Sequence, residues 1–173
     1  MDPLFQATPS REQVVQAVAF WPELSGRRIR PLLVTAFGDI FVETDAGEVW
    51  LASPIDLKCE PIAQSVAELE KLFADPDWAR LRLLTEVALL AKDKGIERPA
   101  DKVFAIAPHP CFTGSILAGQ FVPMDLKVWH SIASQLRLPA LPSPTQRTGL
   151  PVPARPRAPE MLPFGPRASM RIA

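Results

Sequence analysis

The clearest pattern in the chain is an alternation of apolar and polar positions between residues 32 and 52. "IFVET" places Ile40 and Val42 on one face of a strand, and "EVWLAS" repeats the alternation. Between them, "DAGE" offers Gly47 for the positive φ angle of a hairpin turn. Gly38 and Asp39, just before the first strand, indicate a bulge or tight turn. The segment 32–52 therefore predicts a two- or three-stranded antiparallel meander.

Apolar residues at helical spacing predict four helices. Two of them open with a serine followed three residues later by Gln or Glu, at Ser10 and Ser65, which is the spacing of a capping box. Another begins at Asp75-Pro76 and ends before Gly95, and its apolar stripe is Trp78, Leu81, Leu84 and Val87. The predicted helices are 11–20, 66–73, 76–94 and 125–137.

The order of these elements predicts an α+β fold. Two further strands are expected at 102–107 and 116–122. We expect a twisted, mostly antiparallel sheet, with an N-terminal helix at its edge and helices on one face. Residues 1–137 should form a single domain, made of an N-terminal helix and loop (11–30) and a larger region (31–137). The strands of the expected sheet are 32–52, 102–107 and 116–122, and the covering helices are 66–73, 76–94 and 125–137.

The composition changes abruptly after Leu138. Nine of the 20 prolines fall between 139 and 166, which is incompatible with a helix or a sheet ladder, so 138–173 is expected to be a disordered Pro/Arg-rich tail. Residues 1–137 carry 14 Lys and Arg against 18 Asp and Glu, a net charge of −4. An acidic body argues against direct binding of nucleic acid, which requires a basic surface.

The cellular compartment is indicated by what the sequence lacks. It shows no signal peptide and no apolar run of the roughly 18 residues that a membrane span needs. Two cysteines, Cys59 and Cys111, are expected to be buried thiols of a reducing compartment. A cytoplasmic protein that does not contact the membrane is therefore expected.

Few residues are available for catalysis or metal binding. Cys59, His109, Cys111 and His130 are not spaced as zinc ligands are, so neither a metal nor another cofactor is expected. Nucleotide-binding glycine motifs and a G-x-S-x-G elbow are absent. Cys111 with His109 or His130 could form the thiolate–imidazole pair of a hydrolase, although a packed thiol is favoured. A non-enzymatic protein is expected.

A binding function is favoured instead. Acidic residues gather on the hairpin and at the helix starts, and they could meet a protein with a basic surface. An alternative is a regulatory or scaffold module that binds through its proline-rich tail. The acidic residues proposed for the partner surface are Asp39, Glu43, Asp45, Glu48, Glu68 and Asp75.

The motif order resembles a known family. "AFGDIFVETDAGEVWLAS", "IAQSVAELEKLF", "DWARLRLLTEVALLAKDKGI" and "VFAIAPHPCFTGSILAGQFVPMDLKVWHSIASQL" are similar to the C-terminal domain of bacterial type VI secretion immunity proteins. That group neutralises DNase effectors and often follows a GAD-like domain. The resemblance implies an antitoxin-like binder that occludes a secreted toxin, such as a nuclease, in the cytoplasm. The matching residues, expected to be structural, are Gly38, Asp39, Gly47, Val49, Trp50, Pro108, Pro110, Gly114 and His130.

Overall fold

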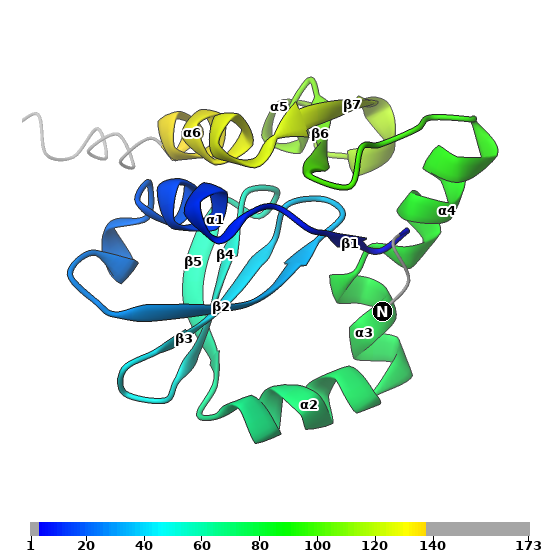
Figure 1. The fold of residues 1–173 in the computed structure, drawn as a ribbon. Helices are drawn as coiled ribbons and strands as arrows, with labels where there is room; N and C mark the ends of the chain where they lie inside the picture. Colours follow the sequence, from blue (N-terminus) through cyan, green and yellow to red (C-terminus); the bar gives the residue numbers. More distant parts are fainter. Residues whose placement is uncertain (1–3, 138–173) are drawn as a thin grey trace, which may run out of the picture. The chain divides into compact units, whose positions relative to one another are not determined.

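The computed structural model describes residues 4–137, which adopt an α+β fold (Figure 1). The expected tail, 138–173, lies outside the described residues. The strands are β1 (Gln6–Ala7), β2 (Ile29–Thr35), β3 (Ile40–Thr44), β4 (Val49–Ser53), β5 (Lys58–Ala63), β6 (Lys102–Ala107) and β7 (Gln120–Asp125). The α-helices are α1 (Arg11–Val18), α2 (Val66–Ala74), α3 (Pro76–Arg82), α4 (Thr85–Asp93), α5 (Pro110–Thr113) and α6 (Leu126–Leu136), and the 3-10 helices are η1 (Pro22–Leu24) and η2 (Ile116–Ala118).

The predicted meander is the centre of a five-stranded antiparallel sheet in the order β1-β2-β3-β4-β5. Ile40 lies opposite Ala52 across the β3–β4 hairpin, and Gly47 in its turn has a φ angle of +83°. The outer strand β5 was not predicted, because Pro61 and two charged residues interrupt its apolar pattern. An edge strand tolerates such residues, since one side of its backbone needs no partner.

Helices cover both faces of this sheet, rather than one face as expected. Successive residues of a strand point to opposite sides. Ile40 and Val42 belong to a core cluster with residues of α1 and α6, whereas Phe41 belongs to a cluster with Leu69 of α2. Figure 1 shows α1 and α6 on one side of the sheet and α2 on the other. The second face is covered because Phe41, Val49 and Leu51 make it apolar as well.

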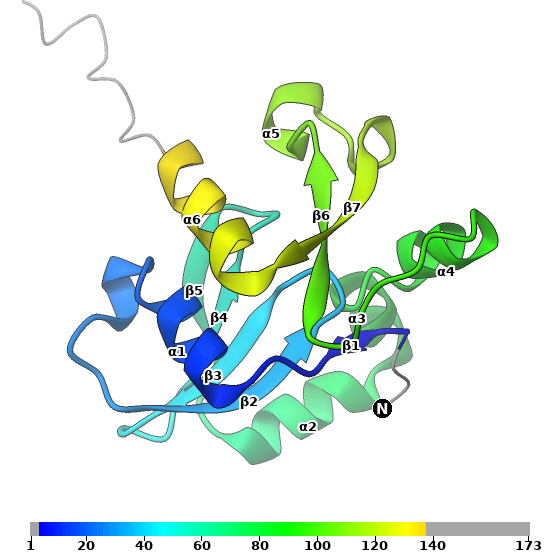
Figure 2. The same ribbon diagram turned by 45° about the horizontal axis from the view of Figure 1, so that its top comes forward.

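β6 and β7 form a separate two-stranded ladder instead of joining the main sheet (Figure 2). The expected strand 116–122 begins only at Gln120, because residues 116–118 form the 3-10 helix η2, which is capped by the Ser115 side chain. Gly119 then allows a close approach of the two strands. A Cβ atom there would lie 2.5 Å from Cγ2 of Ile106.

The expected helix 76–94 is broken into α3 and α4. Leu84 interrupts it with a φ angle of +49°, in the left-handed region that non-glycine residues rarely adopt. The break lets the two halves reach different parts of the core: Trp78 packs beside Phe73, while Ala88 and Ala91 pack with Phe104. The end of the helix follows the prediction, with Gly95 at a φ angle of +67°.

Candidate functional site

Several residues of the family-like motifs meet in the interior, where α6 crosses the turn between β2 and β3. Nε2 of His130 donates to the carbonyl oxygen of Gly38 over 2.8 Å, and Nδ1 accepts from Nε1 of Trp21 over 2.7 Å. These two bonds fix the neutral Nε2–H tautomer. His130 is fully buried, and burial lowers the pKa of its imidazole to about 4, against the opposing hydrogen bond to Gly38.

His109 is also buried and has both ring nitrogens engaged. Nδ1 accepts from the backbone N–H of Cys111 over 3.1 Å, so Nε2 donates to the carbonyl oxygen of Pro54 at 2.9 Å. With His130 bonded on both sides as well, neither imidazole presents a free nitrogen to the Cys111 thiol. This geometry does not favour the thiolate–imidazole pair that the sequence left open.

The two thiols differ from the prediction that both are buried. Cys59 is buried, and burial raises the pKa of its thiol to about 12. Cys111 is exposed, which corrects the prediction, because the short helix α5 extends from the end of the β6–β7 ladder (Figure 2). Among residues 4–137, no group of three or more His, Cys, Asp or Glu side chains is gathered closely enough to hold a metal ion.

The acidic residues of the hairpin are largely neutralised by arginines. Arg30 lies opposite Glu43 in the β2–β3 register, and its Nε donates to that carboxylate over 2.6 Å. Arg27 lies 3.6 Å from Glu48 and stacks over the ring of Trp50. The hairpin rim is therefore mixed in charge rather than acidic.

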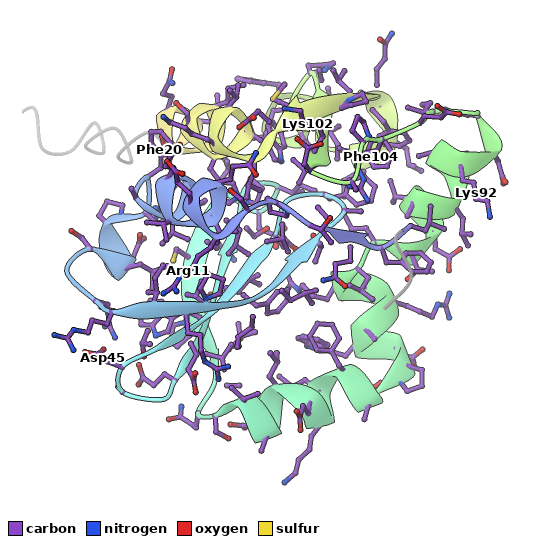
Figure 3. All side chains as sticks on the ribbon, viewed as in Figure 1. Arg11, Phe20, Asp45, Lys92, Lys102 and Phe104 are labelled. Atoms are coloured by element: carbon purple, nitrogen blue, oxygen red, sulfur yellow. The ribbon has the colours of Figure 1, made fainter. Side chains whose placement is uncertain are left out.

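Three other predicted acids remain at the surface. Asp45 is exposed on the β3–β4 hairpin (Figure 3). Glu68 and Asp75 are also exposed, and both serve the starts of helices. The carboxylate of Glu68 accepts from the backbone N–H of Gln64 ahead of α2, while Asp75 caps α3. Glu68 and Asp75 therefore have local roles at the starts of α2 and α3.

The sequence places Asp39 on the partner surface, which would require an exposed acid. In the structure its side chain is only 5% exposed. The tight turn at Gly38, which has a φ angle of +92°, directs it inward, and the backbone N–H of Asp39 donates to Oγ1 of Thr35. Burial raises the pKa of its carboxyl to about 6. The Ser53 hydroxyl and the positive charge of Arg82 both act to lower that pKa, but they do not offset the burial.

Asp39 lines a cleft of about 220 Å³ between the sheet and the α3–α4 junction. Nη1 of Arg82 lies 3.1 Å from Oδ2 of Asp56 and 3.7 Å from Oδ2 of Asp39. The other oxygen of Asp39, Oδ1, is buried without a hydrogen-bond partner. The lining residues are Asp39, Ser53, Ile55, Asp56, Leu81, Arg82, Leu84 and Ile116.

Large apolar side chains are exposed on the elements that line this cleft or contact them. Leu81 is 72% exposed, and Leu117, which follows the cleft residue Ile116, is 66% exposed. Phe112, on the neighbouring α5, is 70% exposed. The helical stripe in the sequence placed Leu81 on the buried face, but α3 ends at Arg82 and leaves Leu81 outside the core. We call Leu81, Phe112 and Leu117 the apolar rim.

The remaining motif residues occupy constrained backbone positions. Pro110 is the first residue of α5, and Gly114 ends that helix with a φ angle of +71°. The peptide bond before Pro108 is cis. Val49 is fully buried in the sheet, while Trp50 is partly buried beneath Arg27.

Within the described part of the chain, no helix has both the length and the apolar character required to cross a membrane. Comparison of the chain with family models, with curated proteins and with solved structures finds no match.

Proposed function

We propose that this chain is a non-catalytic immunity protein that binds and occludes a cognate secreted bacterial toxin in the cytoplasm. The observation that carries the proposal is the exposure of the three side chains of the apolar rim, each at least 66% exposed, of which Leu81 lines a charged cleft and Leu117 follows the lining residue Ile116. Clustered exposed apolar side chains with charged neighbours are typical of protein-binding surfaces.

Charge and motif order support the choice of partner. The acidic body, with a net charge of −4 over residues 1–137, complements the basic substrate channel that a nuclease toxin must carry. The order of motifs resembles that of type VI secretion immunity proteins. Asp56, which lines the cleft and is 49% exposed, adds an acid to the proposed contact surface, whereas Glu43 and Glu48 of the hairpin are paired with arginines.

The proposal predicts that a reading frame beside the gene for this chain encodes a secreted toxin, and that toxin is the partner for the test. Co-expression of the full chain should protect cells from that toxin, and the purified proteins should form a complex. Phe112→Ser and Leu81→Ser should each weaken the complex at least tenfold, since such anchors dominate interface energies. Val15→Ser is the matched control, because Val15 is an exposed apolar residue (46%) on α1. Full protection by both rim variants would contradict the proposal.

Removal of the C-terminal segment separates this proposal from the scaffold alternative. A chain ending at Leu138 keeps the apolar rim, so it should bind the toxin with nearly unchanged affinity. A protein that captured its partner through the proline-rich segment would instead lose binding on truncation.

A further inference from the structure

The cleft beside the apolar rim contains a carboxylate that lacks one of its expected partners. The Asp39 side chain is 5% exposed, and its ionised form is favoured by the neighbouring Ser53 hydroxyl and by Arg82, which faces Oδ2, but Oδ1 has no hydrogen bond of good geometry. Leaving an acceptor of this kind unpaired in the interior is costly, so the unsatisfied oxygen calls for a specific explanation, and a donor supplied by a bound partner is one. Since Asp39 lines the cleft, a donor that enters it can reach this carboxylate.

We propose that the cleft receives the guanidinium group of an arginine side chain from the protein partner, with Asp39 and Asp56 as its acceptors. This inference rests on the proposed function and names the side chain by which the partner is anchored.

The charges in the cleft favour a single cation. Arg82 lies between the two carboxylates, but it is closer to Asp56 (3.1 Å) than to Asp39 (3.7 Å). When both carboxylates are ionised, the three groups sum to one negative charge. A second guanidinium would balance that charge and supply the missing donor, and its planar fork of N–H groups suits two carboxylates better than a lysine ammonium does.

The size and walls of the cleft also fit one side chain. Its volume of about 220 Å³ is below the roughly 300–1,000 Å³ of typical small-molecule pockets. Ile55, Leu84 and Ile116 provide apolar walls for the methylene stem of arginine. The exposed Leu81 stands at the edge, so partner contacts there would exclude water from the buried ion pair, as in the centres of other interfaces.

Nα-acetyl-arginine amide is the probe for this site. Titration into the isotopically labelled full chain at pH 7.5 should shift the NMR signals of Asp39, Asp56 and Ile116 saturably. The dissociation constant should be on the order of 1 mM, as expected for so small a ligand. The neutral citrulline analogue should shift none of them. Asp56→Asn should weaken binding at least tenfold, whereas Asp45→Asn, which removes an exposed acid of the hairpin, should leave it unchanged.

Three results would overturn the inference: no saturable shifts up to about a hundredfold above that concentration, equal shifts with the citrulline analogue, or undiminished binding by Asp56→Asn. The outcome is distinct from that of the toxin experiment. A toxin complex without arginine binding would reject the anchor and leave the proposed function standing. Arginine binding without a toxin complex would reject the function and leave the cleft as a guanidinium site.

Discussion

The imidazole of His130 donates to the carbonyl oxygen of Gly38 over 2.8 Å and thereby joins two residues that are 92 positions apart in the chain. The indole of the preceding Trp129 donates to the carbonyl oxygen of Phe37 over 3.1 Å. Together these bonds attach α6 to the turn that directs Asp39 into the cleft. The fold around the cleft should therefore depend on the close fit between this turn and α6.

Gly38→Ala should test that fit. Gly38 has a φ angle of +92°, and an added Cβ would lie 2.8 Å from Cδ1 of Trp129. Backbone strain and overpacking should together lower the free energy of unfolding by about 3 kcal/mol, measured by urea denaturation. Gly47→Ala is the matched control, since Gly47 has a φ angle of +83° with no atom within 4 Å of the added Cβ. It should cost about 1 kcal/mol, the backbone strain alone. Equal losses would show that the contact with Trp129 is unimportant.

Trp21→Phe should reveal the contribution of the buried hydrogen bond to His130. The substitution keeps most of the apolar ring but leaves Nδ1 of the buried imidazole without its donor. An unpaired buried acceptor should lower the free energy of unfolding by about 1–3 kcal/mol. Trp50→Phe is the comparison, because its indole N–H donates to Glu48 in a partly exposed position. That variant should lose less than about 1 kcal/mol, and a reversed order of the two losses would contradict the role given to Trp21.

Asp39 and His130 should make opposing contributions to the pH dependence of stability. Asp39 has its pKa raised from 3.8 to about 6, so between these values the folded chain holds a proton that the unfolded chain has lost, and stability falls as pH rises. His130 has its pKa lowered from 6.5 to about 4. Its contribution to the free energy of unfolding is therefore complete above pH 6.5 and is lost as pH falls towards 4. The two effects oppose each other over nearly the same range.

Asp39→Asn should therefore expose the acid sensitivity caused by His130. Relative to the unmodified chain, the variant should lose about 3 kcal/mol of unfolding free energy between pH 6.5 and 4, because one pKa unit corresponds to about 1.4 kcal/mol. Arg82 and Asp56 face Asp39 and are present in both proteins, so comparing the two profiles isolates the Asp39 carboxyl. Urea unfolding at several pH values provides the measurement. Parallel profiles would contradict the opposing pKa shifts.

The sequence predicts the elements of this fold better than it predicts the cleft. Ile40 and Val42 share one face of β3, as the alternation predicts, and Ser10 is followed by the Gln13 that completes its capping box. The break at Leu84 has no local signal, because neither glycine nor proline marks it. It arises from tertiary packing that draws α3 and α4 to different cores.

The cleft depends on contacts between distant segments. Asp39 resembles any acid beside a turn glycine, and only the folded chain brings Arg82 to it from α3. The apolar rim is equally hidden, since Leu81 has the spacing of a core residue until the helix ends after Arg82. A count of charges likewise does not show that Arg27 and Arg30 pair with Glu48 and Glu43, although the basic segment 25–31 precedes the hairpin closely in the sequence.

The two cysteines should differ sharply in reactivity towards iodoacetamide. Cys111 is exposed, whereas Cys59 is buried with its thiol pKa raised to about 12, so only roughly one in 10,000 of the Cys59 thiols is ionised at pH 8. Mass spectrometry should find one rapidly alkylated thiol per native chain and two in urea. Alkylation of both thiols in the native chain would contradict the burial of Cys59.

Cys111→Ser should keep toxin protection, because the proposed function requires no nucleophile. Loss of protection together with loss of a turnover activity would instead favour a Cys/His hydrolase.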